Sequence, residues 1–323
     1  MPRAMPGSAT LLLPARAAFA GRDLPRDVAV ALGRGDAFSG EPGDAAQLQR
    51  HFTLLPRAWP VAALTRAVDA ADAAGAQWLR ADPAWVRPDI NGARLFAAGE
   101  GMGLAREDAD ALLPALRPLF GDAGMPIDAP HPSRWYLRVA PGIPLPAFQE
   151  PAEALGADLG DALVEPGVGA APDARRWRAL LSEAQVVLHN HPWNARRAAE
   201  GKPPVNSLWF WGAGTLPDHV AAAASAVRSA DVLLQGLAAR AGIAHATVPA
   251  RFEAGPAGSS ALFDLRPERD SDALCDAWLR PAARALRDGK LAALQLDFED
   301  GAGFRIAPGQ RWRFWRRPLA TLA

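Results

Sequence analysis

The sequence is poor in cysteine and in lysine, and its charges cancel. Cys275 is the single cysteine, which excludes an internal disulfide framework and a zinc site built from thiolates. The 35 basic residues, nearly all of them arginine, are balanced by 35 acidic residues, so a nucleic acid is not expected as a partner. No apolar run approaches the roughly 18 residues of a membrane span. We therefore expect a cytoplasmic protein with no membrane contact.

The apolar content of the chain is sufficient for a large core. Half of its 323 residues are hydrophobic and 11 are tryptophan, which excludes an intrinsically disordered chain. No internal repeat or linker-like segment interrupts the sequence. We expect one large α/β unit over residues 1–323.

Strand-like and helix-like patterns alternate along most of the sequence, which predicts the α/β class. Short apolar runs predict strands at 9–13, 77–80, 94–97, 134–140, 205–211, 261–265 and 294–298. Apolar residues at helical spacing predict helices at 61–71, 105–120, 177–188, 220–241 and 272–287. Asp272 is the expected N-cap of the last helix, and Pro281 is expected to interrupt it.

The C-terminal region predicts an antiparallel hairpin of residues 303–306 with residues 311–315. The second segment alternates arginine with aromatic residues. We expect its aromatic side chains to pack inward, with a partner-binding surface as the alternative.

The densest group of polar side chains lies between the helix at 177–188 and the turn after the strand at 205–211. It contains His191, Asn194, Arg197 and Asn206. Ligands of open α/β sheets bind at the carboxyl ends of strands, where glycines let backbone N–H groups approach an anion. The turn that begins at Trp211 and Gly212 has this position. Packing and helix capping are the alternative role for these side chains, and the favoured one for His189.

Metal binding has weaker support in the sequence. His189 and His191 do not share a helical face at this spacing, so they do not predict a metal site. Asp297, Glu299 and Asp300 follow a strand, where carboxylates bind hard cations, but a turn ending in Gly301 explains them equally well. Cys275 lies in an amphipathic pattern and is expected to be buried and inert.

Two motifs in the middle of the chain resemble a known family. They are His191-Pro192-x-Asn194-x-x-Arg197 and Gly201-Lys202-x-Pro204-x-Asn206-Ser207-Leu208-Trp209-x-Trp211-Gly212-x-Gly214. They resemble a segment of archaeal-type cofactor-independent phosphoglycerate mutases, of the alkaline-phosphatase superfamily. With the stretch from Leu104 and the residue Arg134, the resemblance covers residues 100–250. The whole chain, including the tryptophan- and arginine-rich end, is similar to the RpfE family of proteobacterial regulatory proteins.

The resemblance implies a catalytic apparatus that this sequence lacks. The superfamily uses two divalent metals held by Asp and His, with a Ser or Thr nucleophile behind an N-terminal Asp-Gly. The metals clamp the attacking and leaving oxygens of the phosphoryl group. Here the strand ending at Leu13 is followed by Pro14-Ala15-Arg16. Where the family has Asp-x-x-x-His, this chain has Asp300 followed by Phe304 in the histidine position.

We therefore interpret the chain as a pseudoenzyme: a non-catalytic regulatory or ligand-sensing protein with a degenerate alkaline-phosphatase-like mixed sheet flanked by helices. It is expected to use no cofactor and to bind a small phosphorylated or carboxylated metabolite. The expected ligand-binding residues are Arg134, His191, Asn194, Arg197, Asn206, Trp211 and Gly212. Two alternatives stay open. One is an active mutase or phosphatase in which Asp297, Glu299, Asp300 and a histidine hold a metal such as manganese. The other is an interaction module with a protein partner.

Overall fold

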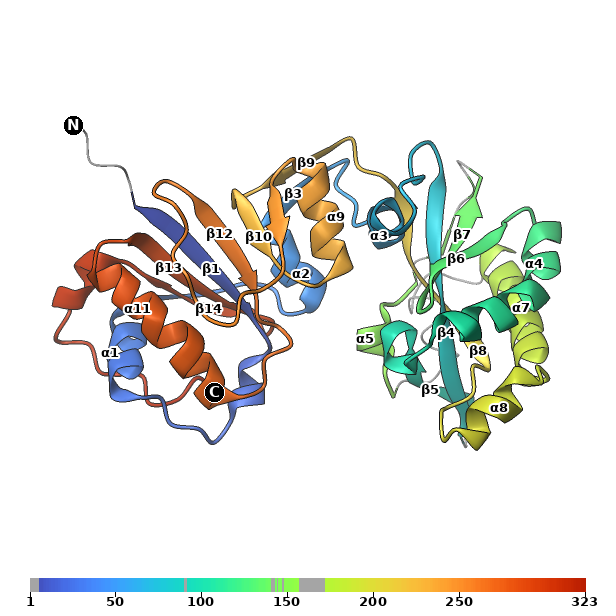
Figure 1. The fold of residues 1–323 in the computed structure, drawn as a ribbon, viewed down its shortest axis with the longest axis horizontal. Helices are drawn as coiled ribbons and strands as arrows, with labels where there is room; N and C mark the ends of the chain where they lie inside the picture. Colours follow the sequence, from blue (N-terminus) through green and yellow to red (C-terminus); the bar gives the residue numbers. More distant parts are fainter. Residues whose placement is uncertain (1–5, 90–91, 141–142, 144, 147, 157–171) are drawn as a thin grey trace. The chain divides into compact units, whose positions relative to one another are not determined.

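The computed structural model describes residues 6–89, 92–140, 143, 145–146, 148–156 and 172–323 (Figure 1). The chain forms two compact units where one was expected. The first comprises Met1–Arg57 and Asp218–Ala323, and the second is Ala58–Pro217. The division arises because β3 (Phe52–Leu55) pairs antiparallel with β9 (His219–Ala222), so the chain between them forms a core of its own. Most of the segment 141–172, expected to be irregular, lies outside the described residues.

The first unit is built on a mixed sheet of seven strands in the order β11-β10-β12-β1-β13-β14-β2. The first five are parallel, and β14 runs antiparallel to both of its neighbours. The strands are β1 Gly7–Leu13, β2 Asp36–Ser39, β10 Ala226–Arg228, β11 Ala244–Ala246, β12 Ser260–Asp264, β13 Leu291–Phe298 and β14 Ala302–Ile306. The central strand β1 ends in three fully buried leucines, as expected for a strand covered on both faces. The predicted α/β class and mixed sheet are confirmed.

Helices flank this sheet. They are α1 Arg26–Arg34, α2 Asp44–Gln49, α9 Val232–Arg240, α10 Ser271–Ala273 and α11 Arg280–Arg287. Figure 1 shows α1 and α11 side by side on one face, where they contact each other and the strands β14 and β13 respectively. Aliphatic residues of both helices and of β1 share one hydrophobic core.

The predicted helix over 220–241 is wrong in its first half. That segment forms β9, β10 and then α9. Its alanines favour a helix, but β9 pairs with β3, and β10 pairs with β11 and β12, so pairing in the sheet outweighs local propensity. The helix begins after Asp231, whose side chain caps the backbone N–H of Leu233.

The helical region near residue 280 begins two residues earlier than predicted. Asp270, not Asp272, is the N-cap, because its side chain accepts hydrogen bonds from the backbone N–H groups of Asp272 and Ala273. A π-helical segment, Leu274–Leu279, then precedes α11, which accommodates Pro281 in its first turn.

The C-terminal hairpin exists with a different partner. Residues 303–306 belong to β14, which pairs with β13, while Pro308–Trp312 form a 3-10 turn. Two arginines of this segment bond to the rest of the unit: Arg313 pairs with Asp36, and Arg316 donates to the carbonyl oxygen of Gly35. Consequently Trp312, Phe314 and Trp315 are 66%, 78% and 69% exposed, and the expectation that they pack inward is wrong.

The second unit is an antiparallel sheet centred on one long strand. Its strands are β4 Gln77–Asp89, β5 Gly92–Ala98, β6 Ile127–His131, β7 Arg134–Val139 and β8 Ser207–Thr215. β4 pairs with β5, β7 and β8. The helices are α3 Val61–Asp69, α4 Arg106–Asp122, α5 Pro151–Ala154, α7 Pro172–His189 and α8 Trp193–Ala199, with a 3-10 turn at Gly99–Met102. The helices predicted at 61–71, 105–120 and 177–188 are confirmed.

The described residues of the second unit form three hydrophobic clusters, one of them around Leu95 and Trp209. α4 and α7 contact each other and bury the largest cluster, which includes Trp135, Trp177 and Phe210. α3 packs on β4 and β8 with a smaller cluster around Trp78 and Tyr136. Within the described part of the chain, no helix is both long and apolar enough to cross a membrane.

Candidate functional site

The residues expected to bind a ligand all lie in the second unit, and the structure divides them among three places. His191, Asn194 and Arg197 lie where α7 passes into α8. Asn206 lies at the start of β8. Arg134, Trp211 and Gly212 lie near α3.

The residues between α7 and α8 form a network of hydrogen bonds within the protein. The amide of Asn194 donates to the carbonyl oxygens of Leu188 and Val205 at 2.8 and 2.9 Å and accepts from the N–H of Val205 at 2.9 Å. Nδ1 of His191 accepts from the backbone N–H of Trp193 at 3.2 Å. These bonds connect the end of α7, the start of α8 and the chain leading into β8. Asn194 therefore has its polar atoms directed at the backbone.

Arg197 is 1% exposed and lies at the centre of this network. Its Nη1 lies 2.8 Å from Oδ2 of Asp108, and it donates to the carbonyl oxygens of Met102 and Pro203 at 3.1 and 3.0 Å. Burial opposes ionisation of Asp108, but hydrogen bonds from Trp193, the Ala105 backbone and Arg197 lower its pKa overall. In this structure the guanidinium is used to join α8 to α4.

Asn206 extends the pairing of β8 with β4. Its Nδ2 donates to the carbonyl oxygen of Val86 at 2.8 Å, and its Oδ1 accepts from the N–H of the same residue at 2.9 Å. The side chain thus takes the place of a neighbouring strand's backbone.

The third place is a buried charge network on β4, β7 and α3. Arg80 forms a two-pronged ion pair with Asp82 at 2.7 and 2.8 Å, and its guanidinium lies 5.3 and 5.2 Å from the ring centroids of Tyr136 and Trp211. The Trp211 indole N–H donates to Asp82 at 2.7 Å. Arg134 pairs with Asp69 through two bonds of 2.7 Å.

The edge of this network reaches solvent at Arg134. Its Nη1 donates to Oε1 of Glu100 at 2.5 Å, and the side chain of Glu100 is 66% exposed. Asp69 also accepts from the Tyr136 hydroxyl at 2.6 Å, and although burial opposes its ionisation, Arg134 and Tyr136 lower its pKa overall. Burial raises the pKa of Tyr136, which therefore keeps its proton at neutral pH. Arg134 is thus a cation, 13% exposed, that has one buried and one exposed carboxylate partner.

Gly212 serves packing between β8 and α3. Its φ is +65°, and a Cβ at this position would lie 2.9 Å from Cβ of Val61 and 3.3 Å from the backbone N of Ala62. The sequence predicts glycine here to let an anion approach the backbone. In the structure it lets the first turn of α3 approach instead.

We expect Gly212→Ala to lower the free energy of unfolding by about 2–4 kcal/mol, through left-handed backbone strain and the clash with Val61. Gly201→Ala is the matched control, because Gly201 has φ +71° with open space around its Cβ position, so it reports backbone strain alone. Urea denaturation of both variants measures the difference. Equal losses would show that the contact with α3 is not tight.

Further charged groups gather in the first unit, at the carboxyl edge of the parallel strands. Asp297, at the end of β13, is 0% exposed. Its Oδ1 accepts from Nη2 of Arg50 at 2.6 Å, and its Oδ2 lies 2.8 Å from Nε2 of His51. Burial opposes ionisation of Asp297, but its bonds to His51 and Arg50 lower its pKa overall. Gln47 of α2 donates to the carbonyl oxygens of Leu13 and Asp297 beside them.

A second cluster at this edge surrounds Arg266, which follows β12. Its guanidinium contacts three carboxylates, Asp264 at 2.7 Å, Asp44 at 2.5 Å and Asp231 at 2.6 Å. Asp264 also accepts from the hydroxyl of Ser229 at 2.6 Å. Arg50, His51 and Arg266 were not singled out from the sequence, since each lies far along the chain from most of its partners.

These carboxylates do not fit a metal centre. Both oxygens of Asp297 are already used by protein groups, Arg50 and His51, and Asp300 pairs with Arg16 at 2.8 Å. Across the described ranges, no three His, Cys, Asp or Glu side chains are arranged to hold a metal ion. Positive charge at this edge is supplied by the guanidinium groups of Arg50, Arg266 and Arg16. Cys275 is buried, and burial raises its pKa to about 11, which agrees with the inert thiol predicted.

Together these features define an α/β protein whose parallel-strand edge is neutralised by its own arginines. Comparison with known sequences then shows that the chain is related to bisphosphoglycerate-independent phosphoglycerate mutases. It is 30% identical over 136 residues to that enzyme of Methanosarcina acetivorans, a match covering 41% of this chain and 30% of the relative. It is 40% identical over 76 residues to the same enzyme of Methanosarcina mazei, a match covering 22% of this chain and 19% of the relative. The chain thus matches less than a third of the length of these relatives. No protein-family profile matches it.

Two solved structures align along most of the chain with low similarity. The cofactor-independent phosphoglycerate mutase of Thermoplasma acidophilum has a TM-score of 0.41 at 16% identity, covering 94% of this chain and 89% of its own. The PH0037 protein of Pyrococcus horikoshii has a TM-score of 0.45 at 14% identity, covering 94% and 87%.

Proposed function

We propose that this protein is a non-catalytic, cytoplasmic regulatory or ligand-sensing relative of the phosphoglycerate mutases, of the RpfE-like kind, that binds a small phosphorylated or carboxylated metabolite. One observation carries the non-catalytic part. The carboxylates at the carboxyl edge of the parallel strands are bonded to Arg266, Arg50 and His51. A guanidinium in this position balances charge but cannot polarise a phosphoryl oxygen as a Lewis acid does.

Within the described residues, no hydroxyl directly follows the central strand β1 of this edge. β1 ends at Leu13 and is followed by Pro14, Ala15 and Arg16, none of which bears a hydroxyl. Ser229 has a hydroxyl nearby, but it donates to Asp264 and accepts from the N–H of Asp231 at 2.9 Å, and the residue is fully buried. It therefore serves to hold Asp264.

The ligand-binding part rests on Arg134. Its guanidinium is fixed by Asp69, which leaves one face paired only with the exposed Glu100. A phosphate or carboxylate can replace Glu100 without disturbing Asp69, and a fixed guanidinium suits such planar, two-pronged recognition. Trp211 belongs to the neighbouring Arg80 network, and Gly212 lets α3 pack on β8. Asn194, Arg197 and Asn206 support the unit from within. His191 supports the turn between α7 and α8.

The test is calorimetric titration with 3-phosphoglycerate. We expect Arg134→Lys to weaken binding by at least about tenfold, because the fork geometry is lost while the charge is kept. Glu100→Gln should strengthen binding by about threefold, because a competing carboxylate is removed. Arg138→Lys, at an exposed position of the same strand, is the matched control and should bind as the parent does. Unchanged affinity in the first two variants would exclude Arg134 as the binding residue.

Two other functions are separated by simple measurements. Turnover of 3-phosphoglycerate by the purified protein with manganese would overturn the non-catalytic proposal and favour a rearranged metal site.

The exposed Trp312, Phe314 and Trp315 favour, as a second candidate, a protein-interaction role. Replacing all three by serine should abolish association with a partner in that case and leave metabolite binding intact.

A further inference from the structure

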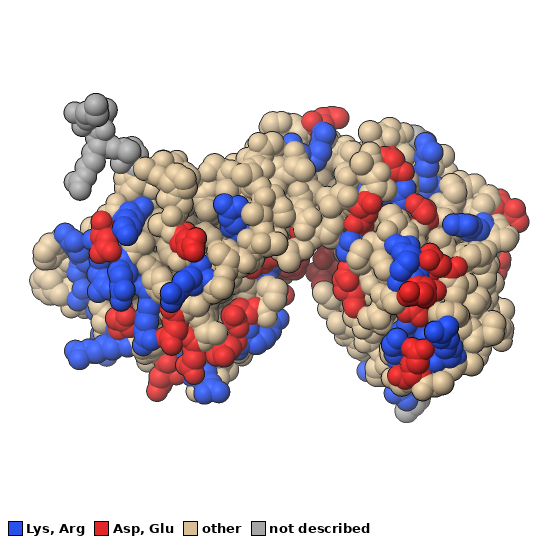
Figure 2. Space-filling model, viewed as in Figure 1, with Lys and Arg blue, Asp and Glu red and all other residues tan. Residues whose placement is uncertain are grey.

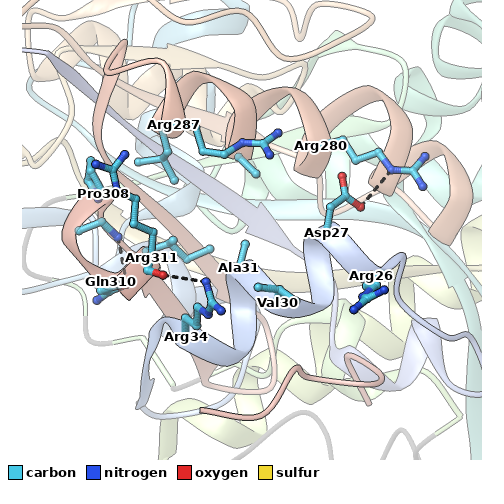
Figure 3. A pocket seen from close by; sticks show the side chains of 14 residues that line it. Arg26, Asp27, Val30, Ala31, Arg34, Arg280, Arg287, Pro308, Gln310 and Arg311 are labelled. Carbon is cyan, nitrogen blue, oxygen red and sulfur yellow. Dashed lines mark hydrogen bonds and ion pairs between the residues drawn. The ribbon is translucent and has the colours of Figure 1, made fainter. Parts of the chain in front are cut away.

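A second region of the molecule has the form of a ligand site. A cavity of about 650 Å³ lies in the first unit between α1 and α11, next to the turn at 308–312 (Figure 3). Small-molecule sites have volumes of about 300–1,000 Å³. The cavity is therefore large enough for a molecule of metabolite size. It involves neither the strand-edge carboxylates nor Arg134.

The floor of this cavity is apolar. It is formed by Val30 and Ala31 of α1, Ala283 and Leu286 of α11, and Ile306 of β14. Leu286 and Ile306 belong to the hydrophobic core of the unit, so the cavity opens directly onto that core. An apolar floor of this kind favours a ligand with a hydrocarbon or aromatic body.

The rim of the cavity is positively charged. Five arginines line it, against the single carboxylate of Asp27. They are Arg26, Arg34, Arg280, Arg287 and Arg311. Figure 3 shows them around the opening from α1, α11 and the 308–312 turn, and Figure 2 shows basic side chains gathered at the edge of this unit where α11 ends.

Most of these arginines have no acidic partner. Arg280 pairs with Asp27 at 3.5 Å and with Asp276. For the other four, the described residues provide no carboxylate within ion-pair distance. Arg34 donates to the carbonyl oxygen of Arg311 at 2.7 Å, and its buried Nε has no hydrogen-bond partner in the described part of the chain. By contrast, the buried or half-buried Arg50, Arg134, Arg197 and Arg266 are each paired with carboxylates.

We propose that this cavity binds an organic anion with an apolar body, whose carboxylate, sulfate or phosphate group is held by the rim arginines. The apolar body replaces water over Val30, Leu286 and Ile306. The acidic group supplies the negative charge that the protein does not provide, and arginine binds such groups through paired N–H donors. The proposal stands independently of the function proposed for Arg134.

The probe for this site is 1-anilinonaphthalene-8-sulfonate, which joins an aromatic body to a sulfonate and fluoresces when it leaves water. We expect saturable binding at one site per chain. N-phenyl-1-naphthylamine, the neutral analogue, should bind at least about tenfold more weakly, because it lacks the charge. Octyl sulfate should displace the probe, whereas octanol should not. Equal binding of the charged and neutral probes would overturn the proposal.

Two variants locate the site. Arg287→Ala should weaken probe binding by about five- to tenfold, and Ala31→Trp should abolish it by filling the cavity. Arg117→Ala, an exposed arginine of α4 in the other unit, is the matched control and should bind as the parent does. Circular dichroism and the thermal midpoint establish that each variant is folded. Undiminished binding by folded Arg287→Ala and Ala31→Trp proteins would place the probe elsewhere and overturn the proposal.

A vesicle experiment distinguishes a free amphiphile from a lipid headgroup. Octyl sulfate below its micelle concentration should displace the probe, and vesicles of phosphatidylcholine with phosphatidylglycerol should not, because the cavity is sized for one small molecule. Displacement by the vesicles, lost in Arg287→Ala, would instead assign the same chemistry to a membrane surface and overturn the small-molecule assignment.

Discussion

Replacement of Arg197 by alanine is expected to lower the free energy of unfolding of the second unit by about 3–5 kcal/mol. The substitution leaves the carboxylate of Asp108, itself almost fully buried, without its counter-ion. It also removes donors from the carbonyl oxygens of Met102 and Pro203. Urea denaturation followed by tryptophan fluorescence measures the loss.

The neighbouring Arg196 provides the control. It lies on the exposed side of α8 and pairs with Glu200 one turn away at 3.3 Å. Such a surface pair contributes about 0.3–0.5 kcal/mol, and the guanidinium also lies 4.5 Å from the Trp193 ring centroid, a contact of about 0.5–1 kcal/mol, so Arg196→Ala should cost about 1 kcal/mol. Losses that differ by less than about 1 kcal/mol between the two variants would mean that Arg197 is not the structural centre described above.

Replacement of Arg266 by methionine is expected to lower the free energy of unfolding by about 3–5 kcal/mol at pH 7. Methionine keeps much of the side-chain volume but leaves Asp264, Asp44 and Asp231 facing one another without a cation. Arg251→Met, at an exposed position of the same unit, is the control and should change stability by less than about 0.5 kcal/mol.

The loss caused by Arg266→Met should depend on pH in a defined direction. Burial opposes ionisation of Asp264, but Arg266 lowers its pKa below 3.8 overall, so the parent keeps this stabilisation above that pH and loses it only as pH falls through the lower value. In the variant the carboxylate is buried without a cation, so its pKa rises. The difference between the two proteins should therefore shrink from pH 7 to pH 4.5. A difference that is constant over this range would contradict the assignment.

Local patterns were sufficient for much of the secondary structure. Leu11, Leu12 and Leu13 predicted the central strand because a short apolar run is buried on both faces, and the apolar stripes of α4 and α7 matched the core that they form. The helix predicted at 220–241 is wrong in its first half because an alanine-rich sequence indicates only the local helix propensity. Its strands form only because β3 and β12 are there to pair with them, and both are remote in sequence.

The roles of the charged residues were less predictable, because they too depend on partners that are remote in sequence. The sequence showed that Arg134, Arg197 and Asp297 are charged, but their effect depends on partners many residues away. His51 belongs to none of the motifs of the sequence, yet it lies 2.8 Å from Asp297 across 246 positions of sequence. Whether an arginine binds a ligand or a buried carboxylate is decided by long-range packing, which one sequence does not encode in any local pattern.

The antiparallel pairing of β3 with β9 has a consequence for how such proteins gain and lose parts. Leu55 lies opposite His219 in this pair, so the chain leaves and re-enters the first unit at adjacent positions. If the codons for residues between β3 and β9 were replaced by codons for a tight turn, the two strands could still pair in the same register. Insertion, exchange or loss of the second unit is therefore compatible with an unchanged fold of the first unit.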